Sequence, residues 1–293
     1  MTAQLVFVHG RSQEHKDAAT LKGQWISALQ EGLAKSNLGL PIPEPSVRFP
    51  YYGQTLCDLI SDASKVADVV IRGTRTNDPE QRFQYSVLKE VQESMGISDD
   101  EVRQSLGPEV VSRGPLDWEW LHGILEAIDK RVPGGSAAAI ALATRDVYQY
   151  LKNPGIRDSI ESGVRAAFTP GMPTVVVSHS LGTVVAYNLL RREGSTQGWT
   201  VPLLVTIGSP LAVTAIKRSI SPIEYPSCVN KWYNAMDKHD IVALYPLKKP
   251  YFDVDPAIEN KTDVHNRTSN RHGIAGYLDD KGIASRIYDA LTS

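Results

Sequence analysis

Apolar and polar positions alternate along the chain in a way that predicts short buried strands separated by helices. The segment LVFVHG (5–10) is a continuous apolar run that ends in glycine, which is typical of a strand covered on both faces. The following segment has Leu21, Trp25 and Leu29 one helical turn apart. PSVRFPYYG (45–53) reads as a second strand, and the order strand, helix, strand predicts a parallel sheet.

Between residues 54 and 135 this alternation gives way to helical patterns. Residues 56–70 carry one apolar stripe, SDDEV (98–102) begins a helix with a capping-box spacing, and residues 115–132 form a third helical pattern. Such a block is too long for an ordinary crossover connection. We interpret it as a helical insertion, a lid or cap, within a single domain that spans residues 1–293.

The alternating pattern then resumes and continues to the end of the chain. Two helical segments come first, and a strand directly followed by a helix comes next. Further strands and a terminal helix complete the series, so the predicted fold class is α/β, with a mostly parallel central sheet and helices on both faces. The segments are 139–151 and 155–168 (helices), 174–180 (strand), 181–193 (helix), 201–211 and 229–244 (strands) and 270–292 (loop and helix).

Composition excludes several classes of protein. The 293 residues carry a formal net charge of -2 and no long basic block, so nucleic acid is not an expected partner. No apolar run approaches the roughly 20 residues that span a bilayer, and the N-terminus does not read as a signal peptide. Cys57 and Cys228 are the only cysteines, which favours a reducing cytoplasm over a disulfide framework. The oligomeric state stays open.

The segment TVVVSHSLGTVVAYNLL (174–190) indicates a catalytic serine. An apolar strand ends in Ser180 and a helical pattern starts at once, as in G-x-S-x-G enzymes, where the turn exposes the serine hydroxyl. Gly182 meets the need for a small residue after the serine, whereas Ser178 stands where glycine is usual. The alternative is that Ser180 only caps the helix, since serine is a favoured N-cap residue.

A serine nucleophile needs a base, and the base needs an orienting acid. In G-x-S-x-G enzymes the chain order is serine, acid, histidine. His272, in a polar loop before the final helix, is our candidate base, and His265 is the alternative. The segment NAMDKHDIVAL (234–244) offers Asp240 as the acid and Asp237 as its alternative.

The same chemistry needs an oxyanion hole, which is a pair of N–H donors for the developing negative charge. The N–H of Leu181, directly after the serine, is one candidate donor. The second donor is expected in the loop after the first strand, where Gly10 allows a close approach and the N–H of Arg11 is the candidate.

Together VFVHGR, VVVSHSLGTVVAYNLL, LVTIGSPL, NAMDKHDIVA and RHGIAGYL resemble the α/β-hydrolase superfamily, and most of all its lipase- and esterase-like members. The resemblance covers about the first 50 residues and everything after about Ala141, by the order of strands and helices. It implies a Ser-Asp-His triad, a backbone oxyanion hole, and neither cofactor nor metal. The chain lacks the strands with which the usual sheet of this family begins.

Three functions follow as hypotheses. The first is a serine hydrolase that cleaves a carboxylic ester, either a lipid or a small acyl ester, through an acyl-enzyme. The second is an acyltransferase that uses the same triad, and the third is a catalytically inactive scaffold that binds a protein. Five apolar residues of the helical block either line an acyl pocket or form core, and their helical spacing favours core: Tyr85, Trp118, Trp120, Leu121 and Leu125.

Overall fold

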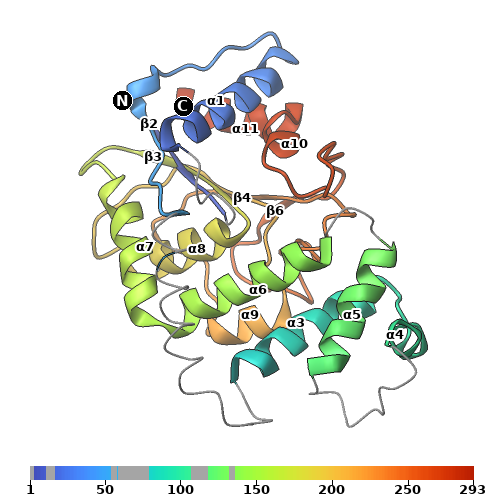
Figure 1. Ribbon diagram of the computed structural model, residues 1–293. Helices are drawn as coiled ribbons and strands as arrows, with labels where there is room; N and C mark the ends of the chain where they lie inside the picture. Colours follow the sequence, from blue (N-terminus) through green and yellow to red (C-terminus); the bar gives the residue numbers. More distant parts are fainter. Residues whose placement is uncertain (1–2, 11–16, 54–57, 59–78, 107–117, 132–135) are drawn as a thin grey trace.

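The chain folds into alternating strands and helices, as the hydrophobic pattern predicts (Figure 1). The structure, a computed structural model, describes residues 3–10, 17–53, 58, 79–106, 118–131 and 136–293. The apolar stripe at 56–70 therefore lies outside the described residues, apart from Asp58. The helices are α1 (Ala18–Ala34), the 3-10 turn η1 (Glu44–Ser46), α3 (Pro79–Ser94), α4 (Asp99–Ser105), α5 (Trp118–Arg131), α6 (Ser136–Lys152), α7 (Pro154–Ala166), α8 (Leu181–Glu193), α9 (Thr214–Ser219), α10 (Ala275–Leu278) and α11 (Lys281–Thr292).

The described residues form a six-stranded sheet in the order β2-β1-β3-β4-β5-β6, and each neighbouring pair is parallel. The α/β class with a parallel sheet is thus confirmed. Because all strands run the same way, the loops after β1, β3 and β5 emerge at one edge, where sites of such sheets gather. The strands are β1 (Gln4–Val8), β2 (Val47–Arg48), β3 (Thr174–His179), β4 (Leu204–Ile207), β5 (Trp232–Ala235) and β6 (Glu259–Lys261).

Both faces of the sheet are covered, as the continuous apolar runs in its strands require. Side chains alternate between the faces, so Phe7 and Val177 pack with α1, α10 and α11, while Val8 and Val176 pack with α6, α7, α8 and α9. Figure 1 shows α1, α10 and α11 together on one side of the sheet, and α7 and α8 on the other.

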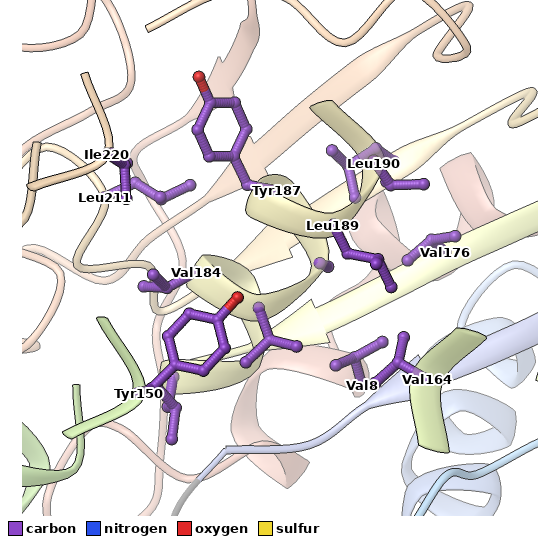
Figure 2. Close-up of a cluster of buried hydrophobic side chains, with 14 of the residues drawn as sticks. Val8, Tyr150, Val164, Val176, Val184, Tyr187, Leu189, Leu190, Leu211 and Ile220 are labelled. Atoms are coloured by element: carbon purple, nitrogen blue, oxygen red, sulfur yellow. The ribbon is translucent and has the colours of Figure 1, made fainter. Parts of the chain in front are cut away.

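Helix α8 is the central element of the second face. Its residues from Leu181 to Leu190 are all buried, which is typical of a helix enclosed on every side. Figure 2 shows its aliphatic side chains together with Val8 and Val176 of the sheet. Any shift of this helix would disturb close packing on all its sides, so the packing fixes the position of the residue at its N-terminus.

The helices α3, α4 and α5 share a separate apolar cluster with the first half of α6. Trp120, Leu121 and Ile124 are buried in it, and the predicted capping box of α4 is present between Ser98 and Glu101. Helix α6 also reaches the main core, because Tyr150 near its end is fully buried there. In the described part of the chain, none of the helices is long and apolar enough to cross a membrane.

Candidate active site

Ser180 lies at the sharp turn between β3 and α8, in a backbone conformation that few residues adopt. Its φ is 56° and its ψ is -128°, and a positive φ is costly for a residue other than glycine. Such strain persists only where the surrounding structure enforces it. Here a buried strand enters the turn and a fully enclosed helix leaves it, so the strain is held from both sides.

Small residues around Ser180 make the turn sterically feasible. A Cβ on Gly182 would lie 2.2 Å from the carbonyl oxygen of Val8, so α8 approaches β1 closely only because this residue is glycine. A Cβ on Gly10 would lie 2.7 Å from Cβ of Ser180. Ser178, where the G-x-S-x-G pattern has glycine, is fully buried and donates through Oγ to the carbonyl of Val205 at 3.0 Å.

The Ser180 hydroxyl faces a histidine. Its Oγ lies 2.9 Å from Nε2 of His272. Ser180 occupies the N-cap position of α8, but its side chain makes no capping hydrogen bond. The alternative, that the Ser180 side chain caps the helix, is therefore not supported. The N-terminus of α8 points at the same place, and its dipole favours negative charge there.

His272 is held in turn by Asp240. Nδ1 of His272 lies 2.7 Å from Oδ2 of Asp240, whose side chain is fully buried. Its other oxygen accepts the N–H groups of Val242 at 2.9 Å and Ala243 at 3.4 Å. Burial alone would raise the pKa of Asp240, but the charge and hydrogen bonds of His272, Tyr277 and Val242 outweigh it and lower that pKa. Asp240 is therefore ionised, and its carboxylate accepts hydrogen bonds from His272, Tyr277 and the backbone.

The two alternative residues lie elsewhere. Asp237 is also buried, but its carboxylate accepts the backbone N–H groups of His239 and Asn266, both at 2.8 Å. It thus stabilises the turn after β5 and the loop that leads to His272. His265 is exposed, and the hydrogen bond that reaches Ser180 comes from His272.

Three further residues support this arrangement and were not singled out in the sequence. His179 donates from Nε2 to the carbonyl of His272 at 2.7 Å, and Tyr277 donates to Oδ2 of Asp240 at 2.6 Å. His9 lies at the end of β1, where Nδ1 bonds the Gly10 carbonyl at 2.6 Å and Nε2 accepts the N–H of Tyr52 at 3.0 Å. Their position at the carboxyl ends of parallel strands was the available signal for the two histidines.

The two supporting histidines are uncharged at neutral pH. Burial lowers the pKa of His9 to about 4. Burial and then the neighbouring His272 lower the pKa of His179 to about 3. A neutral imidazole carries one N–H, so each ring has a fixed donor and a fixed acceptor. In His179 the donor is Nε2, because its partner is a carbonyl oxygen that only accepts.

The predicted oxyanion donors are only partly described. The N–H of Leu181 is at the first position of α8, and within the described residues it has no hydrogen-bond acceptor. Arg11 lies outside the described residues. Gly10, the last described residue before it, packs against Ser180, so the chain leaves β1 next to the serine.

An apolar slit opens beside Ser180. The slit is narrow, and the space between its walls totals about 420 Å³, part of which is open to solvent. Its lining is aliphatic apart from Ser180 and Thr144. Besides these two and Leu181, the lining residues are Val87, Val91, Ile140, Ala143, Val147, Pro210, Val213, Ile216, Ile241, Val242 and Leu244.

The apolar residues singled out in the helical block do not form this slit. Trp120 and Leu121 are buried in the helical cluster and Leu125 packs against it, as the core alternative predicts. Tyr85 also packs against this cluster and lines a separate groove between α3 and α9, and the side chain of Trp118 lies outside what the structure describes. The slit is built instead by α3, α6 and the loops after β4 and β5.

Within the described residues, no group of three or more His, Cys, Asp or Glu side chains is arranged to hold a metal ion. Comparison of the chain with models of known protein families, with curated proteins and with solved structures gives no match. The geometry of the site therefore carries the functional argument by itself.

Proposed function

We propose that the protein is a serine hydrolase that cleaves a carboxylic ester through Ser180. The observation that carries the proposal is the continuous hydrogen-bonded series of three side chains. Ser180 Oγ lies 2.9 Å from Nε2 of His272, and Nδ1 of the same ring lies 2.7 Å from Asp240. A base within hydrogen-bond reach of the serine, itself oriented by a buried acid, is the arrangement that activates a hydroxyl for attack.

In this mechanism His272 removes the proton of Ser180 as Oγ attacks the ester carbonyl carbon. The negative charge that develops on the carbonyl oxygen is stabilised by the Leu181 N–H and the N-terminus of α8, with the Arg11 N–H as the expected second donor. His272 then gives the proton to the leaving alcohol, which leaves an acyl group on Ser180. Water, activated by the same histidine, releases the acid. Asp240 stays ionised throughout and stabilises the imidazolium.

The topology supports the α/β-hydrolase resemblance. In the described sheet, Ser180 follows β3, which lies between β1 and β4, and the acid follows β5. The residue after β1, the serine turn and the two loops that carry Asp240 and His272 therefore converge at one edge. The strained conformation of Ser180 also agrees with the turn on which such nucleophiles sit.

The slit supports a substrate with an aliphatic acyl group. Its wall beside Ser180 offers methyl and methylene groups and no charged side chain. An apolar chain would be desolvated there at about 25 cal/mol per Å² of buried apolar surface. A charged or strongly polar acyl group would lose its water without gaining partners.

A fluorophosphonate probe tests the proposal directly, because it reacts covalently with an activated serine. The purified protein is incubated with the probe, and its intact mass is measured beside that of the Ser180→Ala variant. We expect one adduct on the wild type and none on the variant. Esters of increasing acyl length are then screened, and hydrolysis should likewise depend on Ser180. A well-folded wild type that takes no adduct would overturn the proposal.

A further inference from the structure

Tyr277 forms a hydrogen bond to the candidate acid, Asp240. The residue lies on α10 and is fully buried. Its hydroxyl donates to Oδ2 of Asp240 at 2.6 Å and accepts the N–H of Asp237 at 3.1 Å. This is the same Asp240 oxygen that lies 2.7 Å from Nδ1 of His272. The phenol and the histidine thus share one carboxylate oxygen as their hydrogen-bond partner.

Two donors on one oxygen have a predictable electrostatic effect. Each donor withdraws part of the negative charge of the carboxylate, so each weakens the hold of that carboxylate on the other. A hydroxyl that stabilises the Asp240 anion therefore makes the His272 imidazolium less favourable than Asp240 would alone. Burial and the charge of Asp240 raise the pKa of Tyr277 well above its usual value, so its proton stays in place.

We propose that Tyr277 is a positioning residue that fixes the Asp240 carboxylate against His272 and limits the basicity of that histidine. The catalytic meaning of this role rests on the proposed function. The hydroxyl also orients the acid, because its acceptor side is occupied by the Asp237 N–H and its proton is left for Asp240. The oriented carboxylate in turn keeps Nε2 of His272 directed at Oγ of Ser180, 2.9 Å away.

Several other titratable or charged groups of the described residues lie around this cluster. Asp237, from the turn after β5, contributes a buried carboxylate beside Tyr277. His179 of β3 has its ring 4.7 Å from that of His272, and His9 lies beyond it at the end of β1. From its own loop, Arg271 directs its guanidinium to the carbonyl of Asn266. Lys35, which directly follows α1, pairs with Asp279 at the surface. Among these groups, Asp237 is the one that bonds the Tyr277 hydroxyl directly, through its backbone N–H.

The test is a titration of His272 that does not depend on turnover. Histidine labelled with ¹³C at Cε1 is followed by NMR against pH in the wild type and in Tyr277→Phe, with the His272→Asn variant used for assignment. We expect the pKa of His272 to rise by about 0.5 to 1 unit in Tyr277→Phe, as befits loss of one hydrogen bond to a charged group. A pKa that stays at the wild-type value would overturn the inference.

Tyr187→Phe is the matched control. Tyr187 is also buried, and its hydroxyl likewise donates to one group and accepts one backbone N–H, in this case the carbonyl and N–H of Glu224, both at 3.0 Å. Its hydrogen bonds do not involve the cluster around His272. The His272 titration should therefore stay unchanged in this variant. An equal rise in both variants would mean a general loosening of the fold and would overturn the inference.

A second substitution covers the case in which Tyr277→Phe fails to fold. Incorporation of 3-fluorotyrosine at position 277 keeps the hydroxyl and makes it a stronger donor, so the pKa of His272 should fall instead of rise. An unchanged or raised pKa would contradict the inference. In an active enzyme, the acidic limb of the kcat/KM profile should move in the same direction as the pKa in each variant. A wild type without a phosphonate adduct would refute the proposed function, whereas the titration decides the role of Tyr277 in either case.

Discussion

The edge of the sheet around Ser180 and the helices α3, α4 and α5 of the helical block are held together in different ways. At the edge, Asp240 takes donors from His272, Tyr277 and two backbone N–H groups, and the carbonyl of His272 is bonded by His179. In the block, α3, α4 and α5 pack through a shared apolar cluster, and its ion pairs, such as Arg103 with Asp100, lie at the surface. The first region depends mainly on hydrogen bonds between functional side chains, and the second mainly on apolar packing.

The difference matches what each region would have to do. A base must stay within a few tenths of an ångström of its serine, because misplacement by about 1 Å can cost two orders of magnitude in rate. An acyl pocket only has to exclude water and match a volume, which apolar packing achieves with considerable tolerance. Substitutions at the sheet edge should therefore lower the turnover rate. Substitutions in the apolar wall of the slit should instead change the preference for the acyl group.

Asp240→Asn should have the largest effect. The amide keeps the shape of the side chain, but its NH₂ group offers no acceptor and its oxygen carries no charge to stabilise the imidazolium. We expect kcat to fall by about 10⁴-fold with the fold intact, as for loss of the acid in comparable triads. Steady-state kinetics and circular dichroism check both parts.

Asp237→Asn gives the matched comparison, since Asp237 is equally buried. Its carboxylate serves the N–H groups of His239 and Asn266, so the cost should fall on stability, by about 1–3 kcal/mol. Turnover by the folded fraction should change no more than a few fold. If Asp237→Asn abolished turnover while Asp240→Asn did not, the assignment of the acid would be reversed.

Gly10→Ala should come next, because it disturbs the edge without removing a functional group. The added Cβ would lie 2.7 Å from Cβ of Ser180, and neither atom can move without moving its backbone. A displaced Ser180 should lower kcat about 100-fold. Gly23→Ala makes the same change in α1, where a Cβ meets nothing within 4 Å, and should leave activity unaltered. Equal kinetics in both variants would show that the edge tolerates shifts.

The parts of the site that could be predicted are those encoded in short stretches of sequence. An apolar strand, a serine and an apolar helical pattern place Ser180 at a corner, and Gly182 satisfies a local steric need. The order along the chain was sufficient to suggest Asp240 and His272, and the structure brings His272 next to Ser180 and Asp240 next to His272. Likewise the buried strands β1, β3 and β4 were visible as continuous apolar runs.

The parts that could not be predicted depend on contacts between distant segments. Tyr277 in the sequence is one more aromatic residue near an apolar helix, and its partner Asp240 is 37 positions away. The strand β6 has the sequence ENK and no apolar signature at all. Periodicity shows that α5 and α6 have apolar faces, but only the packing of these helices decides that Ala143 of α6 faces the slit while Trp120 of α5 faces the cluster.

The neutral histidines at the edge predict a loss of stability in acid. The pKa of His9 and His179 is lowered on folding from 6.5 to about 4 and about 3 respectively. The unfolded chain therefore binds more protons than the folded protein below about pH 6.5, and stability falls as the pH decreases through this window. Between pH 7.5 and 5.5 the free energy of unfolding should fall by about 2–3 kcal/mol for the pair.

Urea denaturation at the two pH values measures this loss. His9→Gln and His179→Gln should each show a smaller dependence on pH, because each removes one group that must stay neutral in the fold. His122→Gln changes an exposed histidine of α5 and should keep the full dependence. A pH dependence that persists unchanged in the first two variants would mean that the two rings are charged in the folded protein.

The smallest effect is expected for the wall of the slit. Ala143 of α6 lines it beside Thr144 and Val147, whereas Ala141 on the same helix does not. Ala143→Leu should fill part of a space that is already narrow, so the kcat/KM for longer acyl esters should fall about 10-fold while that for the shortest esters stays unchanged. Val147→Ala should shift the preference the other way.

Ala141→Leu makes the same substitution outside the slit and should leave the acyl preference as it is. The rate of labelling by a small fluorophosphonate tests whether the wall of the slit affects only the acyl preference or also the position of Ser180. Because the probe needs Ser180 and His272 but little of the slit, that rate should stay constant while the preference for esters changes. If Ala143→Leu slowed the labelling as much as it slowed hydrolysis of long esters, the wall of the slit would be part of the structure that holds Ser180. Acyl preference and catalysis would then not depend on separate regions of the molecule.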